Sequence, residues 1–348
     1  MKKKQLLAIL AIFCPLIVLA GDKSPSVFLF DELPNITTGV GLGASGYTGI
    51  LCLSFNKKSS ILVSGDNNNN LIFWDFPSLN KLKVIKEDSE VHSVAWSNDG
   101  TRLASSSFDG ITIWNTKSYE KLLLIPFKYP NSLSFNINDK MLAAGNAAGE
   151  VAIWDPISGK LIKQLKKVID PLDTDRYSGE TATFSPDGTK LFIANSKNNI
   201  MSYDIKNWNL IHSYDGHSKS IDAIAISHNG KLLASMSEDA TIRIWDIDSG
   251  NVLKIIDYKT DSSFGVASSG IKFINDDKFI FAGNMGSPPL HQKGSIRVWD
   301  ISGGSLPIYS YDNTFVELVW RFDLSPDGKY MVTGGGDGEM HLYNKHIE

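Results

Sequence analysis

The chain has 348 residues with 34 basic and 38 acidic side chains, a formal net charge of −4. Both signs are scattered and no basic block occurs, which argues against a nucleic-acid partner, because phosphate binding needs clustered lysine and arginine. Two cysteines are too few for a disulfide-rich scaffold, so a hydrophobic core must hold the chain together.

The first 20 residues have the layout of a secretory signal peptide. Lys2, Lys3 and Lys4 form a basic start, the run 6–20 is apolar, and Val18 and Ala20 are small residues before a cleavage point at Gly21. An uncleaved membrane anchor is the alternative, but the run has about 15 residues and a bilayer span needs roughly 20. We therefore predict a signal peptide at 1–20 and export to the periplasm or the medium.

Cleavage would leave residues 21–348 with a net charge of −7, because three lysines are removed. Cys52 would be the remaining cysteine, so no intramolecular disulfide can form. No later stretch is apolar enough to predict a stable membrane span.

An internal repeat runs along this whole segment. Its marker is an aromatic residue followed by Asp or Asn, recurring at intervals of 40 to 54 residues and closing a short apolar strand that we read as alternating. The seven pairs begin at Trp74, Trp114, Trp154, Tyr203, Trp245, Trp299 and Tyr343.

A second recurring block precedes the aromatic pair. In residues 94–103 an Asn-Asp-Gly sequence separates two apolar strands, and similar blocks occupy 182–191, 224–233 and 322–331. Asp-Gly and Asn-Gly between apolar strands are strong hairpin signals, because glycine tolerates a positive φ. Each repeat is therefore predicted to be an antiparallel meander of four strands that buries its faces against neighbouring repeats.

The repeat resembles the WD40 family, most closely between Gly216 and Asp246. The resemblance implies an all-β, seven-bladed β-propeller with four-stranded antiparallel blades. It also implies a hydrogen-bonded structural tetrad that locks the fifth blade, which consists here of His217, Ser235, Asp239 and Trp245.

Other repeats carry the tetrad only in part. The second has Ser105, Asp109 and Trp114, and the seventh has Thr333 and Asp337. Repeats three and four lack most of it, and we expect those blades to be held by packing alone.

The last repeat stops just after its third strand, at Glu348. The apolar segment 26–31 has the right pattern to supply the missing outer strand. In the family such pairing of the first segment with the last repeat closes the ring and removes an exposed sheet edge.

Irregular length is concentrated in loops that the family geometry places on one face. The insertions comprise residues 31–49, 166–180, 257–269 and 285–294. Long loops gathered on one face of a rigid ring are typical of a binding surface, although neutral drift in exposed loops produces the same pattern.

The residues that start each innermost strand rim the central channel on that same face. By alignment they are Leu51, His92, Asn131, Glu180, Asp222, Ser269 and Trp320. Together with Phe108, Leu51 and Trp320 would form an apolar arc over blades seven, one and two, of the kind that binds proteins. The alternative is that each of these side chains packs under a loop.

Catalytic and metal-binding motifs are absent from the sequence, since the seven histidines lack metal-ligand spacing and no nucleophile elbow occurs. Asp170, Asp173 and Asp175 alternate in one loop, but the lysines beside them favour plain solvation over Ca²⁺ binding.

We therefore expect no cofactor and no metal, and a monomeric, non-enzymatic scaffold that docks a protein or peptide on its loop-rich face. The alternative is an enzyme or small-molecule binder that uses the channel, with Glu180, Asp222 and His92 as its polar candidates.

Overall fold

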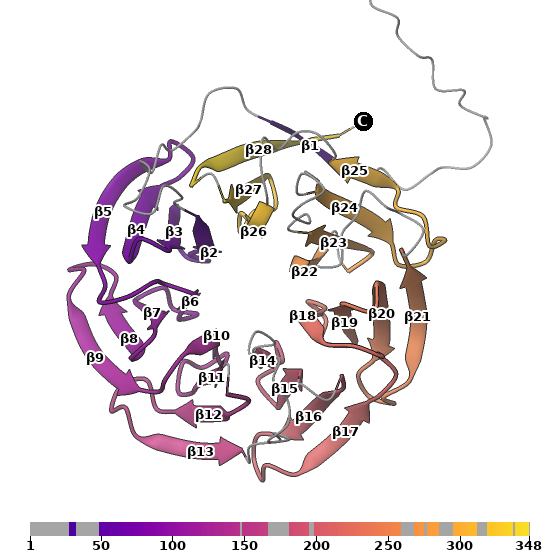
Figure 1. The fold of residues 1–348 in the computed structure, drawn as a ribbon, viewed down its shortest axis with the longest axis horizontal. Helices are drawn as coiled ribbons and strands as arrows, with labels where there is room; N and C mark the ends of the chain where they lie inside the picture. Colours follow the sequence, from indigo (N-terminus) through magenta and orange to yellow (C-terminus); the bar gives the residue numbers. More distant parts are fainter. Residues whose placement is uncertain are drawn as a thin grey trace, which may run out of the picture.

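The structure is a computed structural model that describes residues 28–32, 49–146, 148–165, 181–194, 198–258, 268–274, 277–284, 295–311, 319–336 and 338–347. For residues 28–32, 268, 269, 284, 311, 320 and 345–347 it describes the backbone only. Within these ranges every regular element is a strand, and the strands form seven four-stranded antiparallel sheets. The sheets stand as blades around a common axis (Figure 1), so the predicted all-β, seven-bladed propeller is confirmed.

Six of the blades run from the channel to the rim in chain order, and blade seven takes its outer strand from the start of the described chain. Blade one consists of β2 (Ile50–Phe55), β3 (Ile61–Asp66), β4 (Asn70–Asp75) and β5 (Asn80–Lys86). Blade two consists of β6 (Ser93–Trp96), β7 (Arg102–Ser107), β8 (Gly110–Asn115) and β9 (Lys121–Pro126). Blade three consists of β10 (Pro130–Phe135), β11 (Leu142–Asn146), β12 (Val151–Trp154) and β13 (Leu161–Leu165). Blade four consists of β14 (Thr181–Phe184), β15 (Lys190–Ala194), β16 (Ile200–Asp204) and β17 (Leu210–Tyr214). Blade five consists of β18 (Ile221–Ile226), β19 (Leu232–Ser237), β20 (Thr241–Asp246) and β21 (Val252–Asp257). Blade six consists of β22 (Ser268–Ile274), β23 (Phe279–Asn284), β24 (Ser295–Asp300) and β25 (Tyr309–Tyr311). Blade seven consists of β26 (Val319–Leu324), β27 (Tyr330–Gly335), β28 (Met340–Ile347) and β1 (Phe28–Glu32).

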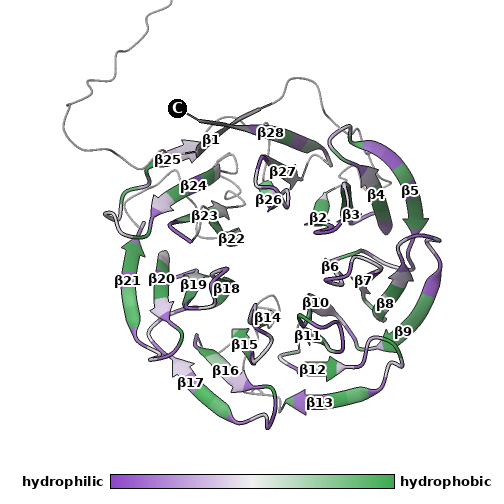
Figure 2. Cartoon of the chain, turned by 180° about the vertical axis from the view of Figure 1, so that it is seen from behind, coloured by the Kyte–Doolittle hydropathy of each residue, from purple (hydrophilic) through white to green (hydrophobic). Residues whose placement is uncertain are grey.

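In most blades the two middle strands are buried on both faces. All four residues of β12 and the four residues 71–74 of β4 are buried, so the expectation of strict apolar alternation in these strands was wrong. The physical reason is that a neighbouring blade covers each face, which favours a continuous apolar run. The outer strands have one solvent-exposed face and carry exposed apolar side chains such as Leu122 and Leu253. Figure 2 shows apolar segments along the rim that these strands form.

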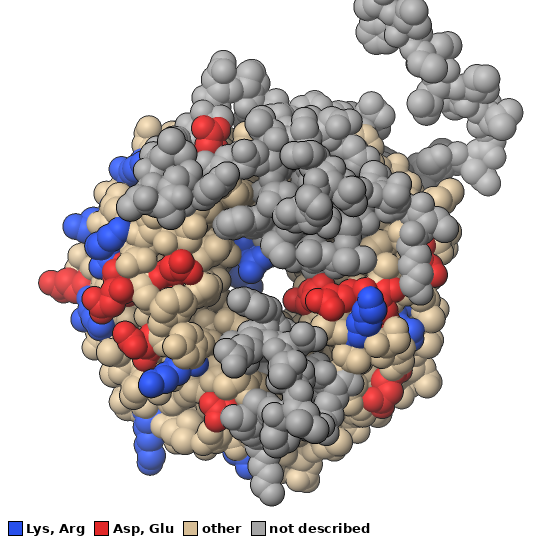
Figure 3. All heavy atoms as spheres, in the orientation of Figure 1, with Lys and Arg blue, Asp and Glu red and all other residues tan. Residues whose placement is uncertain are grey.

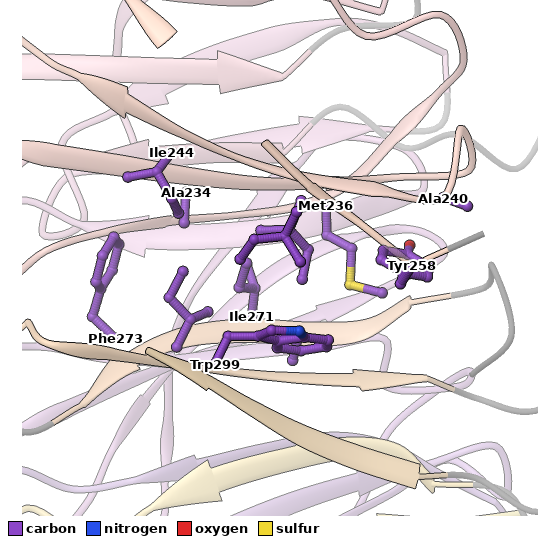
Figure 4. Packing of buried hydrophobic residues seen from close by; sticks show 12 residues of the cluster. Ala234, Met236, Ala240, Ile244, Tyr258, Ile271, Phe273 and Trp299 are labelled. Carbon is purple, nitrogen blue, oxygen red and sulfur yellow. The ribbon is translucent and has the colours of Figure 1, made fainter. Parts of the chain in front are cut away.

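The hydrophobic core is divided among the seven gaps between adjacent blades. The described residues form seven clusters, one for each pair of neighbours. The cluster between blades five and six joins Met236 and Tyr258 to Ile271, Phe273 and the fully buried Trp299 (Figure 4). Because each blade takes part in two clusters, its stability depends on both neighbours.

The hairpins between the first and second strands use the predicted turn chemistry. In blade two the N–H of Gly100 donates to the carbonyl oxygen of Ser97 at 3.0 Å, and Gly100 has a φ of +73°. Gly188, Gly230 and Gly328 occupy the same place in blades four, five and seven with φ between +66° and +72°. The Asp-Gly and Asn-Gly blocks are therefore confirmed as tight turns with a left-handed glycine.

The ring is closed by β1, which pairs antiparallel with β28. The register joins Phe28 to Ile347 and Glu32 to Tyr343, so five residues from the start of the described chain complete the last blade. Figure 1 shows the two strands side by side at the rim. The predicted closure is confirmed, with the strand covering Phe28–Glu32 where the sequence pattern had indicated 26–31.

A second contact joins the blades on either side of this closure near the channel. Asp323, on the innermost strand of blade seven, accepts a hydrogen bond from the backbone N–H of Phe55 in blade one at 2.9 Å. Its other carboxylate oxygen lies 2.7 Å from Nζ of Lys272 in blade six. One carboxylate thus links three consecutive blades, and it is nearly buried, which strengthens both interactions.

Candidate functional site: the loop-rich face

Five of the seven predicted channel-rim residues share one backbone feature. In five blades the pairing of the first two strands shifts register by one residue at the start of the innermost strand. The residues bypassed by these shifts are Leu51, Asn131, Asp222, Ser269 and Trp320. A β-bulge leaves its extra residue outside the ladder and turns its side chain away from the regular position, so this ring of bulges can present side chains at the channel mouth.

Several predicted features lie outside the described part of the chain. These are Glu180, the side chains of Ser269 and Trp320, Asp170, Asp173, Asp175 and Asp337, and the insertions at 33–48, 166–180, 259–267 and 285–294. Of the proposed apolar arc, Leu51 is half-buried and Phe108 is exposed. The arc as a whole stays a prediction.

The structure gathers aromatic side chains from three loops over blade two. Phe108 stacks on His92, with ring centroids 5.4 Å apart and planes inclined by 26°. Tyr129 meets the same Phe108 ring at 5.4 Å and 53°. Phe108 is 39% exposed and Tyr129 is 52% exposed, so we name His92, Phe108 and Tyr129 the blade-two patch.

Backbone hydrogen bonds position each member of the blade-two patch. The N–H of Phe108 donates to the hydroxyl oxygen of Ser89 at 2.8 Å. The N–H of Tyr129 donates to the carbonyl oxygen of Phe108 at 3.0 Å, which ties the loop entering blade three to the turn of blade two. Tyr129 has a φ of +54°, an unfavourable conformation for an aromatic residue that such tertiary contacts maintain.

Acidic side chains border this patch. Nε2 of His92 lies 3.5 Å from the carboxylate of Glu90, and the exposed carboxylates of Asp88 and Asp109 stand beside Ser89 and Phe108 in the chain. Burial lowers the pKa of His92, an effect that Glu90 opposes and that buried Arg321 reinforces. His92 is therefore neutral at pH 7, and the exposed charged residues next to the patch in the chain are two aspartates, Asp88 and Asp109, and one lysine, Lys128.

Tyr129 was not singled out from the sequence. It lies 21 residues from Phe108 and belongs to the next blade, so no local pattern predicts their contact. The available signal was an aromatic residue in a short polar loop, in the segment Phe-Lys-Tyr-Pro before the third repeat. Exposed aromatic residues in such loops are themselves typical of binding surfaces.

The four predicted tetrad residues of blade five form one hydrogen-bonded chain. Nε1 of Trp245 donates to Oγ of Ser235 at 2.9 Å, and that hydroxyl donates to Nε2 of His217 at 2.7 Å. Nδ1 of His217 in turn donates to Asp239 at 2.9 Å. Every donor has an acceptor only if the imidazole is neutral with its proton on Nδ1, so the network assigns this tautomer.

Matches to family models agree with this geometry. The model described as "WD domain, G-beta repeat" matches residues 42–75, 79–114 and 307–344. The model described as "Nucleolar protein 10-like, N-terminal domain" matches residues 118–291, which is half of the chain. The chain belongs to the WD40-repeat β-propellers. Together the two models cover most of the ring.

Curated WD40 relatives are distant. The chain is 25% identical over 211 residues to "Transcriptional corepressor LEUNIG_HOMOLOG" of Arabidopsis thaliana, a match that covers 59% of this chain and 25% of the relative. It is 25% identical over 298 residues to "SIR4-interacting protein SIF2" of Saccharomyces cerevisiae, covering 85% and 46%. It is 25% identical over 308 residues to "Guanine nucleotide-binding protein subunit beta-5b" of Danio rerio, covering 84% and 73%. The chain thus spans less than half the length of the first two, and all three come from eukaryotes.

The other blades of this WD40 propeller depart from the full tetrad in different ways. In blade one Nε1 of Trp74 donates to Oγ of Ser64 at 2.8 Å, a pair that the sequence reading missed. In blade two Trp114 donates to Ser105 at 2.8 Å, but the hydroxyl of Ser105 then donates to Glu87 at 2.5 Å. Asp109, predicted as part of that set, is exposed instead. Glu87 occupies the histidine's place, and burial raises its pKa while the bond from Ser105 opposes that rise.

The expectation that blades three and four are held by packing alone was wrong. In blade four the hydroxyl of Tyr214 donates to the carbonyl oxygen of Ile247 in the next blade at 3.1 Å. In blade three Nδ2 of Asn146 donates to the carbonyl oxygen of Lys128 at 3.2 Å and to Glu150 at 3.0 Å. These bonds replace the tetrad with polar contacts of other residue types, which a search for the WD40 pattern does not detect.

Two observations on the described part of the propeller concern metal-binding and thiol chemistry. It contains no group of three histidine, cysteine, aspartate or glutamate side chains that could hold a metal ion. Burial raises the pKa of Cys52 to about 12, so this thiol is not a reactive nucleophile. No helix in the same ranges is long and apolar enough to cross a membrane.

The tetrad makes the stability of the propeller depend on pH. Burial lowers the pKa of His217, an effect that its bond to Asp239 opposes only in part. A lowered pKa means that the unfolded chain binds the proton more readily, so stability is complete above the unfolded pKa of about 6.5 and falls as the pH drops below it. We expect the urea midpoint to decrease between pH 7 and pH 5.

A substitution of His217 separates its contribution to the pH dependence of stability from the contributions of other titrating groups. In His217→Gln the pH slope should be shallower, while the midpoint at pH 7 is lower because a buried network is broken. An unchanged slope in urea titrations of the variant would contradict the assignment. Burial alone would raise the pKa of Asp239, but hydrogen bonds from Thr241, Ser218 and His217 lower it to about 2, which adds a second loss of stability from about pH 4 downward.

Proposed function

We propose that this WD40 propeller is a non-enzymatic scaffold that docks a protein or peptide partner on its loop-rich face. The observation that carries the proposal is the blade-two patch, which is exposed, aromatic and held by backbone bonds on a rigid ring. Aromatic residues dominate the energetics of protein interfaces, and loops on a rigid scaffold commonly carry binding function.

The names of two relatives are consistent with a role in binding other proteins. One is named as interacting with SIR4 and another as a subunit of a guanine nucleotide-binding protein. Such names describe proteins that act through other proteins. For this chain we infer a monomeric propeller that contributes a docking surface, with no nucleic-acid partner, because the carboxylates around the patch would repel phosphate.

We propose that the predicted apolar arc of Leu51, Phe108 and Trp320 extends the docking surface beyond the blade-two patch. Leu51 and Trp320 occupy bulges at the starts of β2 and β26, so both belong to the rim of the same channel mouth. The alternative role, chemistry in the channel, requires polar side chains that converge on its axis. Among the described residues, His92 stacks on Phe108 and so belongs to the aromatic surface of blade two.

The test compares partner capture by matched surface variants. The chain is immobilised, and proteins bound by the wild type are identified by quantitative mass spectrometry. The double variant Phe108→Ala, Trp320→Ala should lose most of the specific partner signal. The control Ile137→Ala, Ile157→Ala removes two exposed apolar side chains from turns on the opposite face and should retain it. If both double variants captured the same amount of partner protein, docking on the loop-rich face would be contradicted.

We also propose that the protein acts outside the cytoplasm, in a bacterial-type periplasm or the medium. The support is the basic start, short apolar run and small residues of segment 2–20. The check is the N-terminus of the protein purified from its native source, determined by mass spectrometry. A mature chain that begins at Gly21 is the expected result, and an intact Met1–Ala20 segment in a cytoplasmic fraction would refute it.

A further inference from the structure

The loop-rich face combines its exposed aromatic rings with negative charge. Glu90 lies against His92. In the chain, Asp88 precedes Ser89, which accepts the hydrogen bond from Phe108, and Asp109 follows Phe108. Figure 3 shows acidic side chains on this face over blade two and again over blade five, with basic side chains beside them toward the rim. The basic groups near the patch are Lys128, next to Tyr129 in the chain, and the buried guanidinium of Arg321, which acts on His92. The partner surface that complements this region therefore carries positive charge.

The geometry of the rings narrows the class of partner further. Phe108 and Tyr129 are held at an inclination of 53°, and both leave a substantial part of the ring open to solvent. A guanidinium or ammonium group binds over such a ring while carboxylates nearby neutralise its charge. A purely aliphatic partner would use the rings but would bury the carboxylates without compensation, at a cost in free energy.

We propose that the blade-two patch binds an arginine- or lysine-bearing segment of a protein partner, with the cationic side chain seated over Phe108 and Tyr129 and paired with Asp88, Glu90 or Asp109. This inference rests on the proposed docking function and adds the chemistry of the partner. Arginine fits best, because its planar group stacks on a ring and pairs with a carboxylate at the same time. His92 adds no opposing charge, because burial keeps its imidazole neutral at pH 7.

The proposal is tested with the full chain and two labelled peptides of equal length. One alternates arginine with serine and glycine, and the other has glutamate in place of each arginine. Fluorescence anisotropy at 50 and 200 mM salt should show binding of the arginine peptide that weakens with salt, and no binding of the glutamate peptide. Binding of both peptides with similar affinity would overturn the proposal.

Variants distinguish a specific patch from general attraction to an acidic protein. Phe108→Leu with Tyr129→Leu keeps apolar side chains but removes both rings, and should weaken the arginine peptide about fivefold or more. Asp88→Asn with Asp109→Asn should weaken it by a similar factor at low salt. The control Glu120→Gln with Asp248→Asn removes the same charge from exposed turns of the opposite face and should change affinity less than twofold. Equal weakening by the control would assign the binding to net charge and overturn the proposal.

The outcomes also separate this inference from the proposed function. If the ring and carboxylate variants leave peptide affinity unchanged while Phe108→Ala, Trp320→Ala still loses its captured partners, the scaffold role stands and the cationic specificity fails. If the same double variant also retains its partners, the docking face itself is wrong. Equal melting temperatures of all variants show that the changes act on the surface and not on the fold.

Discussion

Deleting residues 22–32 is expected to lower the free energy of unfolding of the propeller by about 3 to 5 kcal/mol. The deletion removes β1, whose five residues pair with β28 and complete blade seven. Each lost backbone hydrogen bond contributes roughly 0.5 to 1.5 kcal/mol. The outer edge of β28 is also left open, which invites pairing between molecules. Urea unfolding of residues 21–348 with and without the segment measures the change.

A smaller deletion is the matched control. Removing residues 22–26 shortens the chain ahead of β1 and should leave the urea midpoint within experimental error of the full-length value. A synthetic peptide covering residues 26–34, added to the longer deletion, should restore part of the stability by occupying the vacant edge. Identical unfolding curves for the full chain and the 22–32 deletion would contradict closure by β1.

Replacing Trp299 with alanine is expected to cost about 3 to 5 kcal/mol, the range for a large aromatic side chain removed from a packed core. Trp299 is fully buried in the cluster between blades five and six. Its Nε1 also donates to the carbonyl oxygen of Ser305 at 3.1 Å, on the segment that leads to the outer strand. The variant thus loses packing between two blades and a tie to the rim of one of them.

The measurement is again the free energy of unfolding in urea. Trp299→Phe should cost less than alanine, because it keeps most of the packing and loses the hydrogen bond. Leu306→Ala is the control in the same segment, since Leu306 is 82% exposed, and its effect should lie within about 0.5 kcal/mol of zero. A Trp299→Ala effect as small as that of the control would refute the role of this cluster.

Much of the fold was predictable because its determinants are local. Asp-Gly and Asn-Gly turns set the hairpins, and the recurring aromatic pair fixed the number of blades at seven. Closure by an N-terminal strand followed from a last repeat that is one strand short. The tetrad residues His217, Ser235, Asp239 and Trp245 lie at the spacing of one complete repeat, so a family pattern places them together.

The candidate site was predictable only in part. Alignment placed His92 and Phe108 in one neighbourhood, and the structure stacks them. Tyr129 joins them from the next blade, and Glu87 replaces a tetrad histidine through a contact with Ser105 across 18 residues. The contact of Tyr129 depends on how a loop crosses from one blade to the next, which no periodic pattern encodes. Glu87 and Ser105 have the same spacing as His217 and Ser235, so the family pattern gives the position of Glu87 but not its residue type.

The amino-acid sequence by itself determined the repeat, the turns, the ring closure and the complete tetrad of the fifth blade, because each is written in short segments with strong local preferences. Only the tertiary structure decided that the middle strands are buried on both faces, that Asp323 links three blades, and that three aromatic rings meet beside carboxylates on one face. These features arise when separate blades pack against each other. Their partners lie 16 to 268 residues apart, beyond the reach of a local rule.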